Sequence, residues 1–262
     1  NNQNSGDHIY TTSVELTAAA SATAPTITSV VNGASFVPGI MQYSWVTIKG
    51  TNLSTTTRLW TGSDFVSGAL PTALDNVSVT INGKAAYVEY ISPTQINVLS
   101  PADSSTGTVE VKVTSGGVAS SAFGATLNAY SPAFFTFDGT YLAATHADGS
   151  LVGKTGLFSG VTTTPLKPGE TFILYGTGFG ATSPAYTAAS LPTEVGNVST
   201  PFTVTVGGIQ ATVSFAGLLP NYAGLYQLNV KAPDTVSAGD QMVAVTMGGA
   251  TSPNAYIMVQ AQ

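Results

Sequence analysis

Four sequence blocks occur twice along the chain, in the same order and at a nearly constant spacing. The pairs are VTIKGTNL and FILYGTGF (starting at residues 46 and 172), INGKAAYV and VGGIQATV (81 and 206), QINVLSP and QLNVKAP (95 and 227), and VKVTSGGVAS and VAVTMGGATS (111 and 243). Their shifts are 126, 125, 132 and 132 residues. A repeat of this kind requires two copies of one structural unit.

The repeated blocks have the pattern of β-strands. Residues 77–81 (VSVTI), 109–113 (VEVKV) and 202–206 (FTVTV) alternate between apolar and polar positions or are rich in β-branched side chains. Asn82-Gly83 separates two such runs, which is the strongest short-range signal for a β-hairpin. We therefore predict an all-β protein with two immunoglobulin-like β-sandwich domains in tandem.

The repeat also sets the domain boundaries. We predict an N-terminal extension at 1–24, a first domain at 25–129, a connector at 130–164 and a second domain at 165–262. The connector is rich in large apolar side chains that need burial, so we expect it to pack against the domains and to fix their relative angle.

The motifs GTNL and GTGF, the NGKAA and GGIQA hairpins and the two QxNVxxP segments resemble the TIG/IPT type of immunoglobulin-like repeat. SWVTIKGTNLS and PGETFILYGTGFG more closely resemble an uncharacterised repeat family at the C-termini of large secreted bacterial proteins. The resemblance implies a fold and says almost nothing about function.

Composition narrows the class of protein. The chain is 43% hydrophobic and only 8% charged, with a net charge of −6 and singly scattered basic residues, so nucleic acid is a poor partner. No apolar run of about 18 residues is present, which argues against a membrane span. Because the sequence begins with Asn1 and not Met, we expect a secreted, extracellular or cell-surface protein whose signal peptide has been removed.

The sequence offers little for catalysis or cofactor binding. It has no cysteine, two histidines (His8 and His146) and no GxSxG motif. The glycine-rich segment 176–180 is followed by prolines and not by a helix, so we interpret it as a turn. We predict a non-enzymatic protein without metal or cofactor, although two carboxylates distant in sequence could still meet in a glycosidase site.

The main functional prediction is self-assembly. Residues 9–16 are strand-like, and the side chains of Ile9, Tyr10, Thr12, Val14 and Leu16 are the candidates for pairing with another copy. A strand donated to an open sheet edge would join copies head to tail into a fibre or layer. The predicted partner is therefore a second copy of this chain.

The alternative is a monomeric adhesin or carbohydrate-binding module. Trp60 and Phe65 lie in a long insertion between strands, where planar rings could stack on a sugar. Trp45 begins a strand and is expected in the core.

Overall fold

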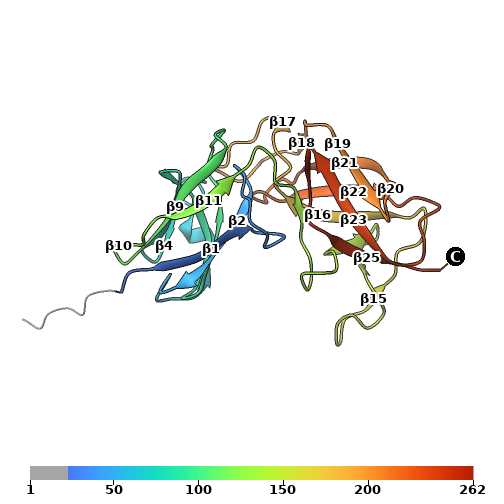
Figure 1. Ribbon diagram of the computed structural model, residues 1–262, viewed down its shortest axis with the longest axis horizontal. Helices are drawn as coiled ribbons and strands as arrows, with labels where there is room; N and C mark the ends of the chain where they lie inside the picture. The colour runs from blue at the N-terminus through green and yellow to red at the C-terminus, as the bar shows by residue number, and fades with distance from the viewer. Residues whose placement is uncertain (1–22, 262) are drawn as a thin grey trace, which may run out of the picture.

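The computed structural model describes residues 23–261, and these are the residues discussed below (Figure 1). Strands dominate them, and their one helical element is the 3-10 turn η1 (Gly62–Asp64). The prediction of an all-β, immunoglobulin-like fold is confirmed. The self-assembly residues Ile9, Tyr10, Thr12, Val14 and Leu16 lie outside the described part of the chain.

Two sheets form the N-terminal half. The first, here called sheet 1, contains in spatial order β1 (Thr26–Asn32), β2 (Trp45–Thr51), β8 (Gln95–Leu99), β7 (Tyr87–Ile91) and β3 (Arg58–Leu59). The second contains β10 (Val118–Ala119), β9 (Gly107–Ser115), β5 (Val77–Ile81) and β4 (Ala73–Leu74), with β11 (Phe123–Leu127) paired to β9 and β6 (Lys84–Ala85) paired to β5.

These two sheets enclose one hydrophobic core. Strand alternation explains it: in β5 the residues Val77, Val79 and Ile81 are buried and the residues between them are not. Val46 and Ile48 of β2 join the same core from the opposite sheet. The outward positions of β2 remain available for other contacts.

Two further sheets form the C-terminal half. The larger one, sheet 3, contains β15 (Thr163–Thr164), β14 (Leu151–Val152), β13 (Ala144–His146), β16 (Thr171–Thr177), β22 (Tyr226–Lys231), β21 (Thr212–Leu218), β18 (Gly196–Val198) and β17 (Thr182–Ser183), with β12 (Ala133–Phe134) paired to β16. The smaller one contains β20 (Ile209–Gln210), β19 (Phe202–Val206), β23 (Gly239–Met247) and β24 (Ala250–Thr251), with β25 (Ala255–Val259) paired to β23.

This half has a core of its own. Phe172, Leu174 and Tyr226 lie at its centre, and Phe134 and Leu142 of the segment 130–164 pack into it. Strands β12 and β13 of that segment pair with β16. The segment predicted as a connector thus contributes strands and core side chains to the C-terminal half, whereas the four domain boundaries stay predictions.

The sequence repeat is visible in individual turns and hydrogen bonds. The central residues of the two hairpin turns have positive φ, as type I′ turns require; they are Asn82 and Gly83 in the first copy and Gly207 and Gly208 in the second. The backbone N–H of Val113 donates to Ser120 Oγ, and that of Val245 donates to Ser252 Oγ, both at 3.1 Å. The two halves therefore share their local geometry as well as their sequence pattern.

The predicted turn at residues 176–180 is also repeated. Gly178 has φ +79° and Asn52, at the matching position, has φ +55°. The residues that follow them, Phe179 and Leu53, are both fully buried. The glycine-rich segment and its counterpart in the first copy are thus turns, and each is followed by a residue that is buried in the core of its own half.

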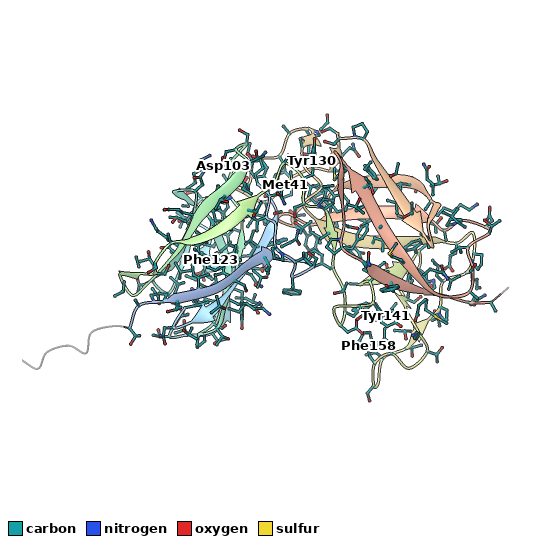
Figure 2. All side chains as sticks on the ribbon, viewed as in Figure 1. Met41, Asp103, Phe123, Tyr130, Tyr141 and Phe158 are labelled. Atoms are coloured by element: carbon teal, nitrogen blue, oxygen red, sulfur yellow. The ribbon has the colours of Figure 1, made fainter. Side chains whose placement is uncertain are left out.

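The two halves lie side by side along the long axis of the molecule (Figure 1). Tyr130 and Met41 lie at their junction (Figure 2). The ring of Tyr130 covers Gly248, where an added Cβ would overlap it. The Asn32 side-chain amide donates to the Ser131 carbonyl at 2.9 Å, so polar contacts also tie the N-terminal half to the segment that follows it.

Candidate functional site: the cleft between the halves

A third hydrophobic cluster lies at the junction, and its buried members belong to neither of the two cores. Its buried members come from the N-terminal half (Leu70 and Leu99) and from the C-terminal half (Ala188 and Ala223). Aromatic side chains surround them, namely Tyr43, Trp45, Trp60, Phe65, Tyr87 and Tyr186. Beside this cluster opens a cleft of about 460 Å³, which we call the junction cleft.

The floor of the junction cleft is the outer face of sheet 1. Trp45 and Thr47 of β2 face outward, because the alternate residues Val46 and Ile48 face the core. The prediction that Trp45 belongs to the core is therefore wrong. Its indole Nε1–H instead donates to the Ala223 carbonyl across the junction, at 2.8 Å.

One wall is the insertion that carries Trp60 and Phe65. The Trp60 ring lies 5.2 Å from the Phe65 ring and 5.9 Å from the Trp45 ring, centroid to centroid, in tilted and edge-to-face geometry. The Trp60 backbone N–H donates to the Glu89 carbonyl at 2.7 Å. The two residues predicted as ligand contacts thus meet in one cleft, and their role as contacts stays a prediction.

Arg58 holds this insertion in place. Its guanidinium contacts Asp64 and Asp75, each at 2.9 Å. Hydrogen bonds from Arg58 lower the pKa of the Asp64 carboxyl far below its usual range, and bonds from Thr56 and Arg58 lower the pKa of Asp75. Both acids are therefore ionised partners of Arg58 at neutral pH.

The opposite wall belongs to the C-terminal half. The loop between β21 and β22 places Asn221 and Tyr222 at the cleft, and 57% of the Tyr222 surface is exposed. A backbone bond from Leu219 N–H to the Leu225 carbonyl closes this loop at 3.0 Å. Gly224, with φ +58°, packs so closely on Leu99 and the Trp45 indole that a larger residue would push the walls apart.

The sequence contains a signal for this wall that the prediction did not use. The spacing between repeated blocks rises from 125 to 132 residues after INGKAAYV, so the second copy holds seven additional residues before QLNVKAP. The structure places them in the end of β21 and the loop that carries Tyr222. Insertions on a conserved scaffold commonly build binding surfaces.

Two polar side chains on the cleft floor were also missed, Glu89 and Asn97. Asn97 Oδ1 accepts hydrogen bonds from Thr47 Oγ1 at 3.1 Å and from Gln95 Nε2 at 2.9 Å. The Asn97 side chain in turn bonds to the Glu89 carboxylate, while burial raises the pKa of Glu89. The cleft therefore combines aromatic faces with an oriented amide and a partly desolvated carboxyl group.

A second constellation gathers around His146, a residue considered above for catalysis. His146 Nδ1 lies 2.6 Å from Glu170 Oε1, and Nε2 lies 2.9 Å from Thr164 Oγ1 and 3.2 Å from the Thr164 carbonyl oxygen. The Glu170 carboxylate and the Thr164 carbonyl oxygen can only accept hydrogen bonds, whereas the Thr164 hydroxyl can donate or accept, so both ring nitrogens have oxygen partners within the fold.

Glu170 is also used structurally. Its second carboxylate oxygen accepts the Lys167 backbone N–H at 2.8 Å. His146 and Glu170 thus tie β13 and β15 to the turn before β16, and we assign the cluster to holding that sheet edge.

Among the described residues, no three His, Cys, Asp or Glu side chains gather as a metal site. Of the described residues that line the junction cleft, Glu89 is the one acid, whereas a glycosidase needs two. Within residues 23–261, no helix is long and apolar enough to cross a membrane.

Comparison with known proteins identifies the N-terminal half. The model of the IPT/TIG domain family matches residues 25–131. Residues 25–131 are an IPT/TIG domain. The predicted resemblance is thereby confirmed for this half of the molecule. No curated protein matches the chain.

Solved structures that resemble the chain are distant. The surface glycan-binding protein PbSGBP-B of Prevotella bryantii shares 12% identity and a TM-score of 0.27 over 89% of this chain and 41% of that one. SGBP-B of a Bacteroides ovatus mixed-linkage glucan utilization locus was solved with a mixed-linkage heptasaccharide. It shares 10% sequence identity and a TM-score of 0.38, over 90% of this chain and 46% of that one. The γ-CGTase of Alkalophilic bacillus clarkii shares 11% sequence identity and a TM-score of 0.29, over 91% of this chain and 26% of that one.

The chain therefore spans less than half the length of each of these proteins. At such identities and TM-scores, the likenesses carry no argument about the function of the IPT/TIG domain or of the half that follows it. The case for function depends on the junction cleft.

Proposed function

We propose that this chain is an extracellular carbohydrate-binding protein that holds a glycan in the junction cleft without cleaving it. The observation that carries the proposal is the gathering of Trp45, Trp60, Phe65 and Tyr222 around one open cleft. Planar rings offer apolar faces to sugar rings, and the neighbouring amides of Asn97 and Asn221 offer donors and acceptors to hydroxyl groups. The volume of about 460 Å³ lies within the usual range of ligand sites.

The internal repeat supports a functional reading of these rings. In the register of sheet 3, Thr171 pairs with Lys231 at the position where Trp45 pairs with Leu99 in sheet 1. The same strand pair therefore folds with small or charged residues at these positions. The aromatic surface belongs to the junction cleft and is not a requirement of the repeat.

The proposal is tested by glycan screening followed by calorimetric titration of the best oligosaccharide. Trp60→Ala and Tyr222→Ala should each weaken binding by about tenfold or more, because each removes one stacking face. Tyr222 is more than half exposed, so its loss should leave the fold intact. Phe36→Ala is the control, since Phe36 is 49% exposed and does not line the cleft.

Two outcomes would refute the proposal. One is a screen that finds no bound glycan at all. The other is an affinity that stays unchanged in Trp60→Ala and Tyr222→Ala.

Fibre formation by strand donation stays a prediction from the sequence. It depends on Ile9, Tyr10, Thr12, Val14 and Leu16, and none of these belongs to the described residues. The junction cleft, by contrast, is formed within one chain, and for this reason we favour the binding function.

A further inference from the structure

We propose that the junction cleft selects glycans that carry a positive charge, such as sugars with a free amino group, and that the Glu89 carboxylate is the group that recognises the charge. This inference rests on the proposed carbohydrate-binding function and names the ligand class of that site. It begins from the placement of Glu89, a half-buried acid on the floor of an aromatic cleft.

Glu89 has no cationic partner in the part of the chain that the structure describes. None of the salt bridges among residues 23–261 involves it. Arg58, on the strand β3 that pairs with β7, is engaged by Asp64 and Asp75. The Lys49 ammonium lies over the Phe36 ring, 5.3 Å from its centre. Asn97 supplies a neutral hydrogen bond only. The negative charge of Glu89 is therefore available to a ligand.

The fold does not need an acid at this position. Glu89 is the additional residue of a β-bulge between Val88 and Tyr90, where β7 shifts register against β8. The C-terminal half has the same bulge between Val213 and Phe215, and there the additional residue is Ser214. A bulge forms with either residue, so the acid in the first copy serves something other than the bulge.

An ammonium group fits the surroundings of Glu89 better than a hydroxyl group does. Burial of an unpaired carboxylate is unfavourable, and a cation offsets this cost by a charge-assisted hydrogen bond. The faces of Trp45 and Trp60 also attract cations, and a pyranose that carries an amine presents a flat apolar face and a cation together. The net charge of −6 draws such ligands toward the protein.

The test compares three oligosaccharides of equal length by calorimetry at about pH 6, where a sugar amine is largely protonated. The probes are β-1,4-linked glucosamine, its fully N-acetylated form and β-1,4-linked glucose. The wild-type protein should bind the glucosamine oligomer at least about tenfold more tightly than either neutral oligomer. Glu89→Gln and Glu89→Ser should both abolish this preference, and Glu89→Ser introduces the residue that the second copy already tolerates.

Glu110→Gln controls for unspecific attraction of a cation to an acidic protein. Glu110 lies on β9 of the other sheet of the N-terminal half, and 67% of its side chain is exposed. Its replacement by Gln removes the same charge as Glu89→Gln does. It should leave the preference unchanged.

Each other outcome is decisive. Equal binding of the charged and neutral oligomers would overturn the charge selectivity and leave the proposed function standing. A preference that survives in Glu89→Gln, or that falls equally in Glu110→Gln, would overturn the role of Glu89. Absence of binding to all three probes and to a wider glycan screen would overturn both proposals.

Discussion

Replacing Trp45 by Thr should loosen the junction without damaging either core. The change removes the hydrogen bond from Nε1 to the Ala223 carbonyl, worth about 1 kcal/mol, and an edge-to-face contact with Trp60, worth about 0.5–1.5 kcal/mol. It also removes the apolar contacts of a partly buried aromatic side chain, and this costs less than a complete truncation in a core, which costs about 3–5 kcal/mol. We expect a total loss of about 3 kcal/mol and a fall in Tm of about 10 °C.

Thr is the residue at the matching position of the second copy, so the strand itself should tolerate it. Trp45→Phe keeps a ring but loses the donor, and should cost about 1 kcal/mol. Differential scanning calorimetry measures both effects, and small-angle X-ray scattering reports whether the halves separate. An unchanged Tm in Trp45→Thr would show that this contact does not hold the junction together.

Two further predictions test the site and the junction by urea unfolding. Because burial raises the pKa of Glu89, the native state binds its proton more tightly than the unfolded chain does, so stability falls as the pH rises above the ordinary value of 4.5. Glu89→Gln should therefore be more stable than wild type in urea unfolding at neutral pH and equally stable below about pH 4, and a lower stability at neutral pH would contradict this reasoning. Gly248→Ala and Gly116→Ala introduce the same strain at φ +54° and +56°, but only at Gly248 would the new methyl group meet the Tyr130 ring. Gly248→Ala should therefore lower the free energy of unfolding by about 1–3 kcal/mol more than Gly116→Ala does in the same assay. Equal losses would show that the packing of Tyr130 on Gly248 does not contribute to stability.

Much of the fold follows from local sequence signals. Alternation in Val77–Ile81 predicts which side chains are buried, and the Asn82-Gly83 pair predicts a turn with positive φ, because both depend on residues close together in the chain. The repeated GTNL and GTGF motifs likewise predict turns that end in buried residues.

The candidate site could be predicted only in part. Trp60 and Phe65 were accessible to prediction because they are large aromatic residues in an insertion between strands. Trp45 was misplaced because alternation predicts two faces of a strand and does not say which face another part of the chain covers. Glu89 reaches the cleft floor through a bulge, and the position of a bulge depends on how β7 pairs with β8, which the residues of β7 alone do not determine.

The most direct test of the account uses the two tryptophans of the chain, Trp45 and Trp60, which both line the junction cleft. Intrinsic tryptophan fluorescence therefore reports on this cleft alone. Titration with the oligosaccharide that binds most tightly should change the emission in a saturable way, with the same Kd as calorimetry, and Tyr222→Ala should shift both curves together. Calorimetric binding without any change in tryptophan emission would place the glycan elsewhere and contradict the account.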